Sequence, residues 1–335
     1  MNTLVTGGAG YIGSHAVQRL LADGHRVTVF DNLYRGHRAA VPDDATLVVG
    51  DLQDYDTILQ TLCDHQIQRV MNFAALTYVG ESVSEPLAYY HNNTAGVLTL
   101  LRAMGEAGVK TFVQSSTAAT YGEPDPDHVP ITEATPQRPL NPYGQSKLMV
   151  EHILRDHAAT DDQFAFAILR YFNVAGSDPQ GRIGEDHDPE THIIPVLLQA
   201  ALGKRDKAYI FGDDYPTPDG TCIRDYVHVV DLVDAHAVVM DALQPGDQRV
   251  YNLGIGNGMS VRQIVDAVKE VTGVDFTVEI ADRRPGDPAV LYADPKKIRD
   301  ELGWQARYTD TQTMVRDAWN WFKAHPQGYA DTADA

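Results

Sequence analysis

The stretch "LVTGGAGYIGSH" near the N-terminus constrains the fold more than any other part of this 335-residue chain. It places Gly7, Gly10 and Gly13 between a short apolar run and an amphipathic stretch. Glycines at this spacing permit a tight strand-to-helix turn and let a pyrophosphate approach the free N–H groups at the helix N-terminus. The alternative is a tight turn without a ligand. The strand before the turn, the helix after it and a later acid together favour a dinucleotide site.

That acid is Asp31, which ends the second apolar run, "VTVFD". A carboxylate at this distance accepts hydrogen bonds from the adenosine ribose hydroxyls and repels a 2′-phosphate, so the pattern predicts NAD rather than NADP. Arg35 and Arg38 lie nearby and weaken this preference slightly. Asp51 closes the third apolar run, where it either meets the adenine edge or serves as a turn or cap residue.

Short apolar runs alternate with amphipathic stretches through the first 120 residues. The runs begin at residues 2, 25, 45, 69 and 110, and each is short enough to be a buried strand of a parallel sheet. This alternation predicts an α/β fold with a Rossmann doubly wound parallel sheet. After about residue 175 the chain becomes polar and turn-rich. We therefore predict an NAD-binding domain over 1–175 and a smaller α/β substrate-binding domain over 176–330, with some later segments returning to the first domain.

Charge and cysteine content narrow the class of partner. The 27 basic and 46 acidic residues give a formal net charge of −19, which argues against a nucleic-acid surface. This acidity either suits a cell interior with a high salt concentration or is only a bias of the amino-acid composition. No apolar run approaches the roughly 18 residues of a membrane helix, and no export signal is visible. Cys63 and Cys222 are too few for a disulfide framework or a cysteine-based zinc site, so we expect a cytoplasmic protein without membrane contact.

The segment "NPYGQSK" places Tyr143 four residues ahead of Lys147, just after a proline that suits a helix start. Positions i and i+4 share one helix face, so both side chains point the same way. A phenol ionises near pH 10, but an ammonium and a positively charged nicotinamide ring lower its pKa. Tyr143 would then take a proton from a sugar hydroxyl while hydride leaves the same carbon. Thr117 ends another apolar run and either hydrogen-bonds the reacting oxygen or satisfies the strand-end backbone.

A glycine-rich turn, a Ser/Thr after a mid-chain strand and Tyr-x-x-x-Lys together resemble the extended short-chain dehydrogenases/reductases. "NFAALTYVGESV", "SSTAATYGE", "RYFNVAG", "EDHDPETHIIP", "IFGDDYPTPDGTCIRDYVHVVDL" and "RRPGD" are similar to motifs of the UDP-glucose 4-epimerases, from about residue 3 to residue 328. The resemblance implies an isomerase of galactose metabolism with tightly held NAD. Such an enzyme oxidises C4 of a UDP-hexose to a transient 4-keto sugar and returns the hydride to the other face. It also implies a homodimer paired through helices that include the one after Tyr143.

The resemblance also implies roles for individual residues. The catalytic residues are Tyr143, Lys147 and Thr117. The cofactor-binding residues are Gly7, Gly10, Tyr11, Ile12, Asp31, Asn32, Asp51, Leu52, Phe73, Ala74, Ala75, Asn92, Ser115, Tyr143, Lys147 and Tyr171. The substrate-binding residues are Thr117, Tyr143, Asn173, His192, Ile193, Tyr209, Phe211, Arg224, Arg284, Asp287 and Leu291.

Several of these assignments compete with plainer ones. Arg224 and Arg284 would grip the UDP diphosphate, since guanidinium groups suit phosphate, but an acidic chain also pairs such residues in surface salt bridges. Tyr209 and Phe211 would flank the uracil, or else they are core aromatics. Leu291 stands where some members of the family carry a bulky tyrosine that limits the room for an N-acetyl group at C2. We therefore predict some activity on UDP-GlcNAc.

Two further positions depart from the family pattern. Thr77 stands where some members carry a lysine near the pyrophosphate, and His192 where some carry an asparagine. His187 and His192 lie in the polar segment "HDPETH", but their spacing fits no common zinc motif and we predict no metal.

Rival functions differ at identifiable residues. A 4,6-dehydratase needs an Asp-Glu pair directly after the threonine, whereas this chain has Ala118 and Ala119. Epimerases of UDP-pentoses or UDP-uronates stay open. A non-catalytic NAD-binding sensor is the alternative of another class, and such relatives typically lose the Tyr/Lys pair.

Overall fold

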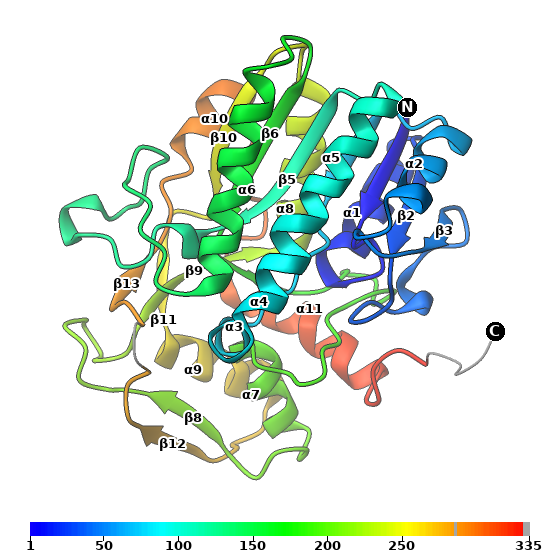
Figure 1. The fold of residues 1–335 in the computed structure, drawn as a ribbon. Coiled ribbons are helices and arrows are strands. Elements are labelled where there is room, and N and C mark those ends of the chain that lie inside the picture. The colour runs from blue at the N-terminus through cyan, green and yellow to red at the C-terminus, as the bar shows by residue number, and fades with distance from the viewer. Residues whose placement is uncertain (285–286, 331–335) are drawn as a thin grey trace.

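A seven-stranded parallel sheet forms the centre of the protein (Figure 1), in a computed structural model that describes residues 1–284 and 287–330. The strand order is β10-β6-β5-β4-β1-β2-β3, and it reverses at β1, the switch point beside which ligands bind in such sheets. This confirms the predicted α/β Rossmann fold. The strands are β1 (Asn2–Thr6), β2 (Arg26–Asp31), β3 (Thr46–Val49), β4 (Arg69–Asn72), β5 (Thr111–Thr117), β6 (Ala165–Tyr171) and β10 (Gln248–Leu253).

Helices cover both faces of this sheet because its strands are apolar on both sides. All seven residues of β6 are buried, as such a strand requires. On one face, α1 (Tyr11–Ala22), α8 (Val229–Ala242) and α10 (Lys296–Leu302) pack into one apolar cluster. On the other face, α2 (Tyr55–Asp64), α5 (Gly96–Ala107) and α6 (Pro142–Ala158) pack into a second cluster.

The strand β10 was not predicted from the sequence. It pairs in parallel with β6, so the chain returns to the first sheet well after residue 176. Its first residue is exposed and only the last three are buried, because it lies at the sheet edge. Its sequence, "QRVYNL", therefore lacks the continuous apolar run that marks the central strands. The predicted division at residues 175 and 176 stays a prediction.

A second lobe lies below the sheet in Figure 1 and surrounds a third apolar cluster. Its helix α9 (Val261–Thr272) begins at a capping box formed by Ser260 and Gln263 and ends at Gly273, in the left-handed region with φ +69°. The other elements of the lobe are α7 (Ile193–Ala201), α11 (Thr311–Ala324), β7 (Asn173–Ala175), β8 (Ala208–Phe211), β9 (Ile223–His228), β11 (Gly258–Ser260), β12 (Val278–Ala281) and β13 (Val290–Leu291).

Short helical segments link these parts of the structure. The helices α3 (Val79–Ser84) and α4 (Pro86–Tyr89) lead through a π-helical turn, Tyr90–Ala95, into α5. Three single 3₁₀ turns cover Arg38–Ala40, Ala118–Thr120 and Pro126–His128. Within the two described ranges, no helix combines the length and apolarity that a membrane span requires.

Close backbone contacts require glycine at two positions of the first turn. Gly7 has φ +69°, and a Cβ there would lie 2.5 Å from the backbone nitrogen of Ala74. A Cβ on Gly13 would lie 2.0 Å from the carbonyl oxygen of Gly7. No larger residue fits at either position without moving backbone, so β1, α1 and the end of β4 meet closely at this turn.

Candidate active site

A cleft with a volume of about 480 Å³ opens at the carboxyl ends of the central strands, within the range of small-molecule sites. The sheet domain contributes Gly10, Ser115 and Tyr143 to its walls, and the second lobe contributes Arg224 and Leu291. The switch point of the parallel sheet therefore faces the substrate side of the second lobe across one continuous space.

The cofactor side of the cleft is built around the N-terminus of α1. Among residues 1–284 and 287–330, no side chain caps this helix by accepting a hydrogen bond from its first N–H groups, whereas Asp54 and Asn141 cap α2 and α6. Such an uncapped end fits a pyrophosphate, which supplies the missing acceptors. Asp31 is fixed beside it, because its carboxylate accepts hydrogen bonds from the backbone N–H of Ala9 at 3.0 Å and of Leu33 at 2.9 Å.

The start of α6 brings the predicted catalytic residues together. Asn141 accepts a hydrogen bond from the N–H of Gly144 at 2.9 Å, and Pro142 opens the helix, so Tyr143 lies in its first turn. The side chain of Thr117, at the end of β5, hydrogen-bonds Tyr143. One turn further, the Nζ of Lys147 donates to the carbonyl oxygen of Ser115 at 3.1 Å.

Burial governs the protonation of this pair. Burial raises the pKa of Tyr143 above its ordinary value, and the hydrogen bond with Thr117 opposes that rise. Burial lowers the pKa of Lys147 to about 8. The protein alone therefore does not make Tyr143 more acidic. The predicted fall of its pKa depends on the positive charge of a nicotinamide ring, and it stays a prediction.

On the substrate side, Arg224 is nearly buried, donates to the carbonyl oxygen of Ile223 at 2.8 Å and forms an ion pair with Asp287. Strand β13 lies parallel to β9, with Leu291 paired to Arg224 in register. Arg224 thus reaches the cleft while it is paired with the carboxylate of Asp287. A bound diphosphate would have to share the Arg224 guanidinium with that carboxylate.

The aromatic residues of β8 lie apart from the cleft walls. Tyr209 is 42% exposed, so it is not the core aromatic that the sequence left as an alternative. Its ring centroid is 6.2 Å from that of Phe211, and the guanidinium carbon of Arg284 lies 3.9 Å from the centre of the Phe211 ring. Contacts of these three residues with uracil or diphosphate stay predictions.

Most of the predicted site residues line the cleft. Among the described residues, five predicted ones do not line it: Asp51, Lys147, Tyr209, Phe211 and Arg284. Asp51 accepts hydrogen bonds from Asn32 and from the N–H of Gln53, a turn role that leaves its predicted adenine contact untested. The predicted residues that line it are Gly7, Gly10, Tyr11, Ile12, Asp31, Asn32, Leu52, Phe73, Ala74, Ala75, Asn92, Ser115, Thr117, Tyr143, Tyr171, Asn173, His192, Ile193, Arg224, Asp287 and Leu291.

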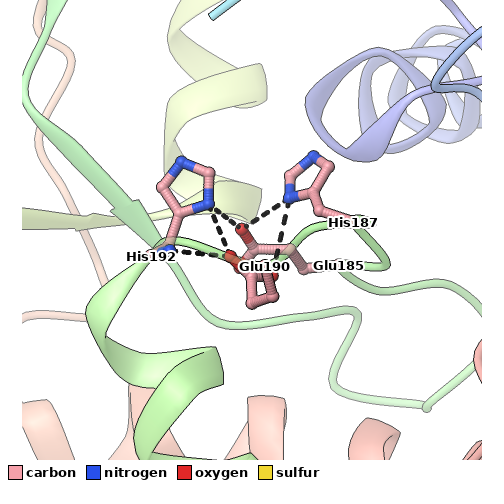
Figure 2. Close-up of side chains that lie close together, drawn as sticks. All are labelled: Glu185, His187, Glu190 and His192. Atoms are coloured by element: carbon pink, nitrogen blue, oxygen red, sulfur yellow. Dashed lines mark hydrogen bonds and ion pairs between the residues drawn. The ribbon is translucent and has the colours of Figure 1, made fainter. Parts of the chain in front are cut away.

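Sequence reasoning missed a cluster of four side chains at the cleft wall. Figure 2 shows Glu185, His187, Glu190 and His192 facing one another from the segment that leads into α7. Burial opposes the charged imidazoles, but the two carboxylates outweigh it and raise the pKa of His187 to about 9 and of His192 to about 10. The run of acids and histidines in "EDHDPETH" was the available signal, but only the two histidines were weighed.

A Rossmann sheet, an uncapped glycine-rich turn and a Thr/Tyr/Lys constellation define an extended short-chain dehydrogenase/reductase. The model of the NAD dependent epimerase/dehydratase family matches residues 3–254, and the chain belongs to that family.

Individual relatives match over nearly the whole chain. The UDP-glucose 4-epimerase of Lacticaseibacillus casei is 49% identical, covering 99% of each chain. A probable UDP-arabinose 4-epimerase of Oryza sativa subsp. japonica is also 49% identical, over 98% of this chain and 84% of its own. The crystal structure of the UDP-glucose 4-epimerase of Bifidobacterium longum, in complex with NAD+ and UDP, superposes with a TM-score of 0.93 at 38% identity, over 98% of this chain and 100% of that one.

Proposed function

We propose that this chain is an isomerase, an NAD-dependent 4-epimerase that interconverts UDP-glucose and UDP-galactose through a transient 4-keto sugar. One observation carries the proposal: Thr117 and Tyr143 line the same cleft as the uncapped N-terminus of α1 and Arg224. The residues that would transfer the proton, bind the dinucleotide and bind the diphosphate therefore line one cleft. The relatives at about half identity carry epimerase names, which supports the same chemistry.

Bound NAD would supply reversible hydride transfer at C4 of the sugar. The chain itself handles the proton. Tyr143 accepts the proton of the C4 hydroxyl and returns it when the new stereocentre forms, and Thr117 orients the reacting oxygen. The carbonyl oxygen of Ser115 holds the ammonium of Lys147. That ammonium would bind the nicotinamide ribose, and together with the positively charged nicotinamide ring it would favour the phenolate of Tyr143.

The other predicted contacts belong to this proposal. The turn at Gly7, Gly10 and Gly13 with the start of α1 would hold the pyrophosphate, and Asp31 would hold the adenosine ribose. Arg224 would bind the UDP diphosphate with its guanidinium fork. The remaining cofactor and substrate residues keep the roles that the resemblance implies.

Turnover without added cofactor tests the proposed function. The purified protein should release NAD on denaturation. The native protein should convert UDP-galactose to UDP-glucose with no NAD supplied, because the reaction has no net redox change. UDP-xylose, UDP-arabinose and UDP-glucuronate assayed in parallel separate the pentose and uronate alternatives. A protein that holds NAD but converts none of these sugars is a sensor, and that result would contradict the proposal.

The size of the residue at position 291 should set tolerance for a C2 N-acetyl group. Leu291 lines the cleft and packs against a small cluster that includes Ala118 and Phe172, next to the end of β5. We expect the wild type to convert UDP-GlcNAc. Leu291→Tyr should lower kcat/KM for UDP-GlcNAc about 10- to 200-fold, the range for overfilling an apolar pocket, and spare UDP-galactose. Equal losses on both sugars would show that Leu291 is not a size filter.

Homodimer formation and a cytoplasmic location are part of the proposal. Leu98 on α5 and Met149 on α6 are 44% and 38% exposed, and the resemblance makes α6, the helix after Tyr143, one of the pairing helices. Two exposed apolar side chains of this kind would be buried in such a dimer. Cys63 and Cys222 are free thiols, as a reducing compartment allows. Light scattering after size exclusion tests the dimer: Met149→Glu should shift the mass toward one chain.

A further inference from the structure

The cluster of Glu185, His187, Glu190 and His192 has the donor set of a metal site. Each residue offers one imidazole nitrogen or carboxylate oxygen, and the four atoms lie within 4.8 Å of one another. No second group of three or more such residues occurs in residues 1–284 and 287–330. Two imidazoles with two carboxylates suit a divalent transition-metal ion, whereas Mg²⁺ and Ca²⁺ prefer oxygen alone.

The separations fit a shared ion. The Nδ1 of His187 lies 3.2 Å from Glu185 Oε1 and 3.6 Å from Glu190 Oε2. The Nδ1 of His192 lies 3.0 Å from Glu185 Oε1 and 2.9 Å from Glu190 Oε1. Ligands about 2.0–2.2 Å from a tetrahedral zinc ion stand about 3.4 Å from one another. The closer pairs would therefore move slightly apart, and the pairs that are up to 4.8 Å apart would move closer together, to hold an ion between them.

Two states can neutralise this cluster. Both carboxylate side chains are at most 5% exposed, so their charges need compensation. Without an ion, two imidazolium rings supply it, and their attraction to the carboxylates is opposed by the repulsion of like charges whose ring centres are only 5.2 Å apart. One divalent cation with two neutral imidazoles balances the same charge without that repulsion.

Hydrogen bonding favours the cation. Each Nδ1 carries at most one proton but faces oxygens of both carboxylates. The buried Nδ1 of His187 makes no hydrogen bond of acceptable geometry, so it is an unsatisfied atom aimed into the cluster (Figure 2). A metal ion gives that nitrogen a partner. It would bind the one lone pair that the Nδ1 of each neutral ring directs into the cluster.

The surrounding backbone orients one of the carboxylates. The N–H groups of Thr191 and His192 both donate to Glu190 Oε1 at 2.7 Å, which fixes that carboxylate with Oε2 turned toward His187. Outer contacts of this kind are typical of ligands held for a metal. We propose that Glu185, His187, Glu190 and His192 bind one divalent transition-metal ion of the zinc class.

The ion would hold the cleft wall in place and would take no part in the epimerisation reaction. The segment Glu185–His192 leads directly into α7, and its residues Glu185, His187 and His192 line the cleft. The ring of His187 lies edge-on to Tyr11 at the start of α1, with centroids 6.3 Å apart. The bound ion would therefore fix the wall where the cofactor side and the substrate side meet, and hold His192 in place.

Metal content tests the site directly. Untagged full-length protein with its NAD is dialysed against a chelator, and zinc, manganese and magnesium are titrated in separate arms by calorimetry. We expect one Zn²⁺ per chain, a raised melting temperature and no binding of Mg²⁺ at the same concentration. Glu190→Gln and His187→Gln should each weaken Zn²⁺ binding at least about 100-fold.

Asp188→Asn is the matched control, because Asp188 is exposed in the same segment, lies outside the cluster and loses the same charge as Glu190→Gln. It should bind Zn²⁺ like the wild type. Retained NAD content shows that each variant is folded. Wild-type protein that takes up neither zinc nor manganese would overturn the proposal and leave an ion-pair cluster. Binding that survives both ligand variants would place the ion elsewhere and overturn it too.

Discussion

Replacing Tyr143 by phenylalanine should reduce kcat for UDP-galactose about 100- to 10,000-fold, the usual contribution of a positioned acid–base group. The ring still fills its place against Tyr89, whose ring centroid lies 6.4 Å away, so the cleft keeps its shape. Only the hydroxyl that meets Thr117 is lost. The amount of NAD released from the purified variant should equal that of the wild type.

Tyr55→Phe is the control for removing a phenol. Tyr55 starts α2, its hydroxyl pairs with Glu106 at the surface, and neither residue lines the cleft. Its activity should match the wild type. A Tyr143→Phe protein that binds NAD and turns over at the wild-type rate would refute the proposed proton transfer.

Arg170→Met should destabilise the fold by about 3–5 kcal/mol, because it leaves a buried carboxylate without its charge partner. Arg170 is 2% exposed and donates to both oxygens of Glu151, at 2.9 and 2.6 Å. Glu151 also accepts a hydrogen bond from Ser116 at 2.8 Å. It lies two turns after Tyr143 on α6, so this network fixes the catalytic helix against β5 and β6. Urea unfolding followed by circular dichroism measures the loss.

Arg155→Met is the matched control. Arg155 pairs with the same carboxylate at 3.2 Å, but its side chain is 36% exposed, so its loss should cost at most about 1 kcal/mol. Similar losses for the two variants would contradict the view that burial sets the strength of this network. The double variant Glu151→Leu with Arg170→Met should recover stability, since no lone charge remains buried.

The same network predicts a pH dependence of stability. Burial opposes ionisation of Glu151, but the Arg170 guanidinium outweighs it and holds the carboxyl pKa below its ordinary value. A carboxylate with a depressed pKa stabilises the fold above its unfolded pKa, near 4.3, and that stability is lost as pH falls through the folded pKa. Unfolding free energy below pH 4 should therefore fall more steeply in the wild type than in the double variant.

Local sequence predicted the elements whose signals are local. The strands "NTLVT" and "RVTVFD" are buried after their first residue because β1 and β2 are covered on both faces, and their Val, Leu and Phe residues gave the signal. The glycines between them leave little choice of turn. The strand β10 escaped prediction because it lies at an edge and only half of it is buried. The Tyr143/Lys147 pair was predicted because both residues share one helix face.

Features that depend on long-range folding were not predictable. The ion pair between Arg224 and Asp287 joins residues that are 63 positions apart in the sequence, and nothing in either segment indicates that they pair. The His/Glu cluster was not predicted because spacing motifs assume a helix or a known loop, whereas these four residues come from an irregular segment before α7. The pKa of Tyr143 depends on burial, which a sequence motif does not report.

The most direct test of the account follows a deuterium label placed at C4 of UDP-galactose. Purified protein with no added cofactor should convert it to UDP-glucose that still carries deuterium at C4, in ordinary water, because the same hydride is removed and returned within one cleft. Product that has lost the label to solvent, or label found at a different carbon, would contradict oxidation and reduction at C4.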